Sequence, residues 1–197
     1  MKLTQEAIDL IKQFEGLRLK AYQDQAGVLT IGYGHTKGVT EGMKITKHGA
    51  KQLLIEDLAR AHAAVDLTIN KPMTDYEFGA FVSLTHNIGV GAFARSTAAR
   101  KFNKGDKGGA AAAILLFNKI TVDGVLVYNQ GLANRREIER RYFFNVVEKD
   151  HIDHYETTAG EGGEHKGVPP AWPIIGALVA AVALFFNDVK EFFFGLF

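Results

Sequence analysis

Residues 4–35 read TQEAIDLIKQFEGLRLKAYQDQAGVLTIGYGH, an amphipathic stretch followed by a glycine-containing turn. Apolar residues recur at helical spacing through 7–14, which predicts a helix with one buried face. Thr4 is a suitable N-cap for this helix, and Gly16 is a suitable stop at its C-terminal end. Glu15 therefore lies at the end of the helix, at the edge of its apolar face.

The second half of this stretch predicts a β-hairpin. Residues 17–21 alternate apolar and polar, residues 28–31 are rich in β-branched side chains, and 24–27 have the composition of a turn. Asp24 then ends the first strand and Thr30 lies early in the second, so that the two are near neighbours across the ladder. Two carboxyl groups and a hydroxyl, supplied by one helix end and one hairpin, suit acid-assisted attack of water on an acetal.

Taken singly, the three residues have simpler interpretations. Glu15 alone is a charged helix flank, Asp24 alone is a turn cap, and Thr30 alone is a good strand former. Their joint spacing, E-x8-D-x5-T, is more specific, and I-G-Y-G-H follows it directly at 31–35. This pattern resembles the phage-type lysozymes, the muramidases that phages use as endolysins.

Later segments match the same family in the expected order. H-N-I-G-V-G-A-F at 86–93, with Ser96, resembles the glycine-bearing turn between two helices of that family. Y-N-Q at 128–130 and A-N-R-R-E at 133–137 resemble the start of its late helix. The resemblance covers roughly residues 1–148.

The resemblance implies hydrolysis of the β-1,4 bond between N-acetylmuramic acid and N-acetylglucosamine in peptidoglycan, for lysis of a bacterial host. Glu15 would donate a proton to the leaving oxygen, while Asp24 and Thr30 position the attacking water. The family suggests inversion, which needs carboxyl groups about 6.5–9.5 Å apart, a distance that the sequence does not supply. The substrate-binding residues implied by the resemblance are Gly34, His35, His86, Asn87 and Ser96. Taken singly, His35 and His86 suit a structural hydrogen-bonding role equally well.

The rest of the body is predicted to be mainly helical. A long helix after Thr46 has a buried stripe, residues 74–77 form a capping box, and residues 110–117 have high helix propensity. Residues 120–127 form a second hairpin signal around an Asp-Gly turn. We therefore expect an α+β, lysozyme-like fold over residues 1–150, with a small N-terminal hairpin lobe and a larger helical lobe.

The net charge of +1 hides an asymmetry. Residues 1–150 hold 21 Lys and Arg against 16 Asp and Glu, a net charge of +5, whereas 151–197 hold 2 against 6, a net charge of −4. A basic body favours encounter with an anionic polymer. Four arginines at 135, 136, 140 and 141 are interpreted as a solvated helix face with Glu137 and Glu139 as partners. Nucleic acid is not an expected partner, because no reader motif accompanies the charge.

Cysteine is absent, so the sequence predicts neither disulfides nor thiol chemistry. Charged residues within 1–14 argue against a hydrophobic export segment, and we expect the protein to stay in the host cytoplasm until lysis and then act on the wall. His151 and His154 are separated by three positions but lack a third spaced ligand, so no metal and no cofactor is expected. The catalytic domain is expected to be monomeric.

Two alternatives to the muramidase function remain open from the residues. A lytic transglycosylase acting on the same bond needs the glutamate but not the Asp/Thr water site. A non-enzymatic envelope-disrupting protein is suggested by the end of the chain. There, a polar, glycine- and proline-containing linker at 151–170 precedes an apolar segment at 171–197 that is expected to be helical.

The apolar segment begins with 16 residues without charge, AWPIIGALVAAVALFF at 171–186. As a helix they extend about 24 Å, less than the ~30 Å hydrocarbon core of a bilayer. Aromatic residues at both ends suit a membrane interface. We expect this segment to associate with the bacterial membrane, and packing on the catalytic body or self-association is the alternative.

Overall fold

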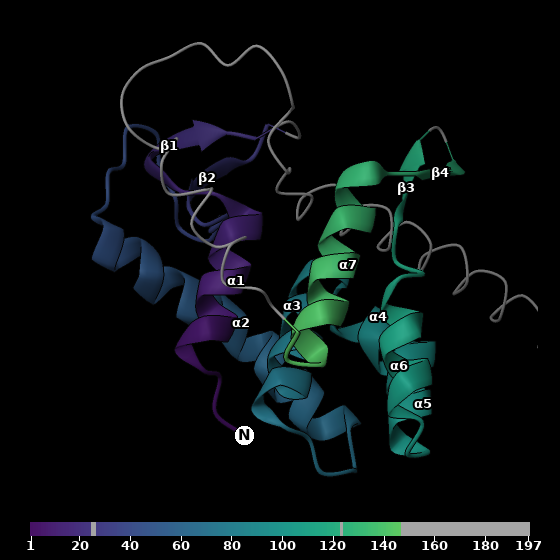
Figure 1. Cartoon of the computed structure of the whole chain (residues 1–197). Coiled ribbons are helices and arrows are strands. Elements are labelled where there is room, and N and C mark those ends of the chain that lie inside the picture. The colour runs from purple at the N-terminus through teal and green to yellow at the C-terminus, as the bar shows by residue number, and fades with distance from the viewer. Residues whose placement is uncertain (25–26, 123, 147–197) are drawn as a thin grey trace, which may run out of the picture. The chain divides into compact units, whose positions relative to one another are not determined.

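The computed structural model describes residues 1–24, 27–122 and 124–146 (Figure 1). The predicted linker at 151–170 and the predicted apolar segment at 171–197 lie outside the described residues, as does the expected domain boundary at residue 150.

The described residues form two compact units. One unit consists of Leu17–Leu54, and the other consists of Met1–Gly16 together with residues 55–146. Helix α2 (Lys47–Thr68) begins in the hairpin unit and continues in the helical unit. The expected small hairpin part and larger helical part are both present, which confirms the predicted fold class for this region.

The hairpin unit is built on strands β1 (Arg18–Gln23) and β2 (Leu29–Gly32), which pair antiparallel as predicted. The register places Tyr22 opposite Thr30 and Gln23 opposite Leu29. The loop that follows β2 returns to the free edge of β1, where Ala21 N donates to Met43 O at 2.9 Å. This added pairing fixes the hairpin on both edges of β1.

The helical unit is centred on α3 (Asp75–Ile88), an apolar helix with nine consecutive buried residues from Glu77 to Thr85. Helix α3 packs against α1, α4 and α7, while α6 packs against α5 and α7. The remaining elements of this unit are α1 (Gln5–Glu15), α4 (Val90–Ala94), α5 (Thr97–Asn103), α6 (Lys107–Ile114), β3 (Lys119–Val122), β4 (Val125–Tyr128) and α7 (Gln130–Phe143).

Side-chain caps begin most of these helices, and those of α1 and α3 are the ones that the sequence predicts. The Thr4 hydroxyl accepts from Ala7 N at 3.2 Å at the start of α1, and Thr74 and Glu77 form the predicted capping box of α3. Helix α6 differs from its predicted range of 110–117. Asp106 Oδ1 accepts from Gly109 N at 2.7 Å, so the cap starts the helix earlier than its alanine run suggests.

The core contains the predicted stripe of α2 and a cluster of aromatic rings. Phe81 on α3 lies 5.3–5.4 Å, ring centre to ring centre, from Phe93, Phe102 and Phe143. These rings join α4, α5 and α7 to the central helix, since aromatic side chains bury large apolar areas. The buried residues of the α2 stripe are Ala50, Leu54, Leu58, Ala61 and Val65.

Candidate active site

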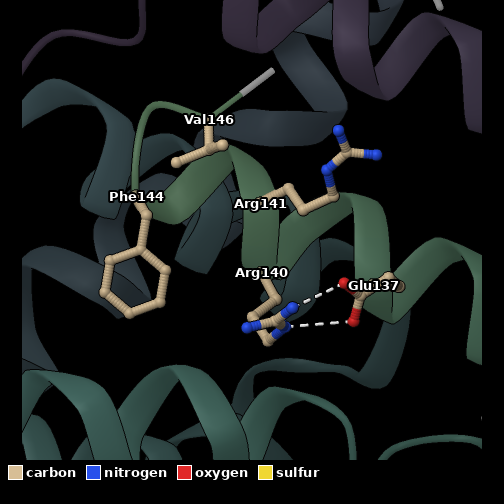
Figure 2. A pocket seen from close by; sticks show the side chains of 5 residues that line it. All are labelled: Glu137, Arg140, Arg141, Phe144 and Val146. Atoms are coloured by element: carbon tan, nitrogen blue, oxygen red, sulfur yellow. Dashed lines mark hydrogen bonds and ion pairs between the residues drawn. The ribbon is translucent and has the colours of Figure 1, made fainter. Parts of the chain in front are cut away.

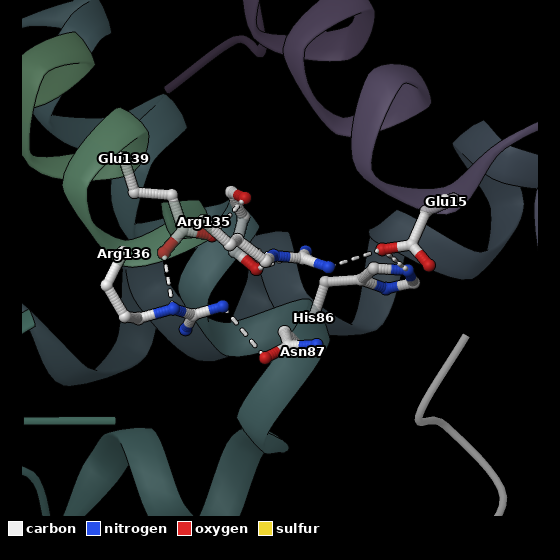
Figure 3. A network of polar contacts seen from close by, with 7 residues as sticks. Glu15, His86, Asn87, Arg135, Arg136 and Glu139 are labelled. Carbon is white, nitrogen blue, oxygen red and sulfur yellow. Dashed lines mark hydrogen bonds and ion pairs between the residues drawn. The ribbon is translucent and has the colours of Figure 1, made fainter. Parts of the chain in front are cut away.

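Glu15, the predicted general acid, is the last residue of α1, and its side chain is only 1% exposed. Arg135 Nη1 donates to Glu15 Oε1 at 3.0 Å (Figure 3). Both groups of this ion pair are buried, since the Arg135 side chain is 7% exposed. The acid is thus held in a defined orientation within the helical unit.

Arg135 is fixed by further contacts. Its Nε donates to Glu139 Oε1 at 3.1 Å, and its Nη2 donates to Ser83 O at 3.4 Å. The guanidinium carbon lies 4.6 Å from the centre of the Phe14 ring, which is a cation–π distance. A planar guanidinium satisfied on several sides has little freedom to leave Glu15.

A second buried pair lies beside the first. Arg136 is fully buried, its Nε lies 3.2 Å from Glu139 Oε2, and its Nη2 donates to Asn87 Oδ1 at 2.8 Å. Burial lowers the pKa of Arg136 to about 10, which still leaves it charged at neutral pH. Two carboxyl groups, those of Glu15 and Glu139, therefore face two guanidinium groups.

These contacts correct the interpretation of the arginine cluster. Arg135 and Arg136 are buried, not solvated, whereas Arg140 pairs with Glu137 near the surface as expected. Glu139 is a partner of the arginines as predicted, but the prediction includes neither its burial nor its contact with Ser83. The available signal is helical spacing in α7, because the arginines and Glu139 recur in phase with buried Leu132 and Phe143.

His86 also faces Glu15. It lies in the last turn of α3, and its Nε2 is 3.8 Å from Glu15 Oε1. Burial lowers the pKa of His86 below its ordinary value of 6.5, although Glu15 acts in the opposite direction. The imidazole is accordingly neutral at pH 7.

In the hairpin unit, Asp24 and Thr30 both contact Val28. Asp24 Oδ1 accepts from Val28 N at 2.8 Å, and the Thr30 hydroxyl donates to Val28 O at 3.0 Å. Asp24 N also donates to Val28 O at 2.9 Å, which continues the ladder beyond β1. Thr30 lies opposite Tyr22, and Tyr22 is two positions before Asp24. Since side chains alternate between the two faces of a strand, the Asp24 and Thr30 side chains lie on the same face of the hairpin.

The other predicted site residues have varied surroundings. Gly34 adopts φ 89°, and the backbone of His35 pairs with Ile31 in a tight turn. His35 Nε2 lies 2.7 Å from Lys37 O. Ser96 is buried, and its hydroxyl accepts from Ala99 N at 3.0 Å as the N-cap of α5. The helical unit thus brings together Glu15, His86 and Asn87, whereas the Ser96 hydroxyl caps the N-terminus of α5.

A cavity of about 320 Å³ lies on another part of the helical unit and contains none of the predicted site residues (Figure 2). Arg140 and Glu137 form a bidentate pair at its wall, with N–O distances of 2.6 and 3.0 Å. The residues that line this cavity are Glu137, Arg140, Arg141, Phe144 and Val146.

Within the described ranges, no helix is long and apolar enough to span a membrane, and no three His, Asp or Glu side chains form a group that could bind a metal.

A buried glutamate at a helix end, followed directly by a short hairpin and then by a helical body, defines the lysozyme-like class of α+β protein. The phage lysozyme family model matches residues 12–139, and the chain belongs to this family. It is accordingly a glycoside hydrolase of the muramidase type.

Individual relatives agree with this assignment. The chain is 41% identical over 143 residues to an endolysin of Acyrthosiphon pisum secondary endosymbiont phage 1, covering 73% of this chain and 98% of that protein. Its fold is similar to that of an endolysin from Escherichia coli O157:H7 phage FAHEc1, with a TM-score of 0.72, 45% identity, and coverage of 75% and 96%. The muramidase domain of SpmX from Asticaccaulis excentricus gives a TM-score of 0.69 at 37% identity, with coverage of 72% and 97%.

Proposed function

We propose that this phage lysozyme is an endolysin that hydrolyses the β-1,4 bond between N-acetylmuramic acid and N-acetylglucosamine, with Glu15 as the general acid. The observation that carries this assignment is the Glu15 carboxyl group, buried at a helix end and held at 3.0 Å by Arg135. A carboxyl group held in a buried site suits proton donation to a leaving oxygen. Family membership favours this hydrolysis over transglycosylation and over a non-enzymatic role.

In the proposed reaction, the proton of Glu15 passes to the glycosidic oxygen as the bond from that oxygen to the anomeric carbon breaks. A water molecule attacks the anomeric carbon from the opposite face, and Asp24 accepts its proton. Thr30 orients this water through its hydroxyl. The side chains of Asp24 and Thr30 lie on the same face of the hairpin, which supports the proposal that both contact this water.

The residues around these groups have separate proposed roles. Gly34 and His35 follow β2 in a tight turn, where the absence of a side chain at Gly34 permits close approach of a sugar. Asn87 approaches substrate from the helical unit, whereas His86, the other predicted contact there, faces Glu15. Ser96 contributes indirectly, by starting α5.

Product analysis tests the assignment. Purified peptidoglycan digested with the wild-type protein should release fragments with free reducing ends, and a 1,6-anhydro end would instead establish transglycosylation. Glu15→Gln should abolish release, whereas Glu6→Gln, an exposed change on the same helix, should leave it unchanged. Undiminished release by Glu15→Gln would refute the assignment. The anomer formed first, followed by NMR, distinguishes inversion from retention.

The proposed place of action extends to the envelope. A monomeric enzyme would reach the wall at lysis, and segment 171–197 would contact the membrane. This part of the proposal is supported by sequence, namely the 16 uncharged residues at 171–186. Deleting residues 169–197 should abolish co-sedimentation with vesicles of bacterial lipids while retaining hydrolysis of purified peptidoglycan. Val182→Asp, a single charge in the segment, should weaken co-sedimentation, and unchanged sedimentation of both variants would refute membrane contact.

A further inference from the structure

The polar atom of His86 nearest Glu15 has unused hydrogen-bonding capacity. His86 Nε2 is buried, lies 3.8 Å from Glu15 Oε1 and has no hydrogen-bond partner among the described residues (Figure 3). The side chains of His86 and Glu15 are 9% and 1% exposed. Since buried polar atoms are normally paired, this nitrogen calls for a functional explanation.

The groups around His86 come from three neighbouring helices. Glu15 belongs to α1, Asp57 to α2, and Arg135 and Glu139 to α7. The three acidic groups favour a charged imidazole, and Arg135 opposes it, but burial is the largest influence and leaves the ring neutral. A neutral imidazole has one nitrogen that accepts a hydrogen bond, which a charged ring lacks.

A protonated Glu15 needs such an acceptor. Arg135, its observed partner, carries only N–H donors and cannot accept the carboxyl proton. Glu139 Oε1 already accepts from Ser83 Oγ at 2.6 Å and from Arg135 Nε at 3.1 Å. His86 Nε2 faces the carboxyl group and is unoccupied, and closing 3.8 Å to a hydrogen bond requires a movement of roughly 1 Å.

We propose that His86 is a positioning residue for the reaction: its neutral ring accepts the hydrogen bond of protonated Glu15 at Nε2 and holds the acid ready between turnovers. This role rests on the proposed function of Glu15. When substrate binds, the glycosidic oxygen replaces Nε2 as the acceptor, the proton moves to that oxygen, and His86 remains neutral throughout. The contact favours the acid form of Glu15 against the field of Arg135.

The pH profile of kcat/KM on soluble peptidoglycan fragments tests this role. His86→Phe keeps a ring but removes the acceptor, so the alkaline limb of the profile should move to lower pH by about one unit, with about tenfold lower activity on that limb. His86→Gln supplies a side-chain oxygen as acceptor, so its alkaline limb should lie close to that of the wild-type protein. KM should change little in either variant.

Other outcomes overturn the proposal. An unmoved alkaline limb in His86→Phe, or a raised KM alone, would assign His86 to structure or to substrate contact. Nitrogen NMR of the wild-type protein gives an independent measurement if the phenylalanine variant folds poorly: at pH 7, Nε2 should be unprotonated and Nδ1 protonated, and the reverse tautomer would refute the role. Persistent activity of Glu15→Gln would instead refute the proposed function itself.

Discussion

Arg135 on α7 donates a hydrogen bond to Glu15 on α1 across 3.0 Å, joining residues 120 positions apart in the sequence. The contact lies in the helical unit and connects the end of the first helix to the last helix. The contact fixes the orientation of the proposed acid, because a guanidinium donates its hydrogen bonds in a defined plane.

Replacing Arg135 by methionine should therefore destabilise the protein strongly. The change leaves Glu15 and Glu139 without their shared cation, and breaking a buried pair typically costs about 3–5 kcal/mol. Urea unfolding followed by circular dichroism measures the loss. Arg60→Met, an exposed change on α2, is the matched control and should stay within about 0.5 kcal/mol of wild type. A similar small effect for both variants would show that the buried pair is not a major source of stability.

Replacing Thr30 separates its hydroxyl from its shape. Thr30→Val keeps the β-branched shape but removes the proposed contact with water. The kcat should fall roughly 10- to 100-fold, because a hydrogen bond to a charged or reacting group contributes about 1.5–3 kcal/mol. Thr30→Ser retains the hydroxyl and should keep most of the activity. The kcat of both variants is measured on purified peptidoglycan, and circular dichroism checks that both are folded. Equal loss in both variants would favour a packing role for Thr30, which is 1% exposed.

Two helical glycines should respond to alanine with opposite signs. A Cβ on Gly79 in α3 would lie 2.8 Å from Ala7 Cβ and 2.9 Å from Tyr142 Cε1, so Gly79→Ala should cost about 1–3 kcal/mol through overpacking. A Cβ on Gly108 in α6 meets nothing within 4 Å, so Gly108→Ala should add about 0.5–1 kcal/mol through helix propensity. Thermal or urea unfolding checks both. Stabilisation by Gly79→Ala would contradict the close approach of α3 to α1 and α7.

The lowered pKa of His86 predicts a pH dependence of stability. Between the lowered folded-state pKa and the ordinary value of 6.5, the unfolded chain binds more protons than the folded chain. Stability should thus be retained above pH 6.5 and lost as the pH falls through that window. His86→Phe should lose less free energy of unfolding between pH 7.5 and pH 5 than wild type, and His48→Gln, an exposed control, should lose as much as wild type. An identical pH dependence for all three proteins would refute the burial of a neutral His86.

Much of the local structure follows from short-range sequence patterns. The helix ending at Glu15, the hairpin carrying Asp24 and Thr30, and the capping box at Thr74 were all predicted, because caps, turns and apolar periodicity act over a few residues. The start of α6 was misplaced because the cap at Asp106 outweighs the composition of the alanine run that follows.

The sequence by itself determined the helix-then-hairpin order, the proposed catalytic triplet and membership of the phage lysozyme family, since all three depend on residue types at fixed spacing. Only the tertiary structure decided which charges are buried. Arg135 and Arg140 both lie on α7, yet one is buried against Glu15 and the other pairs with Glu137 near the surface. The physical reason is that burial depends on which helices pack against α7, and these come from distant parts of the chain.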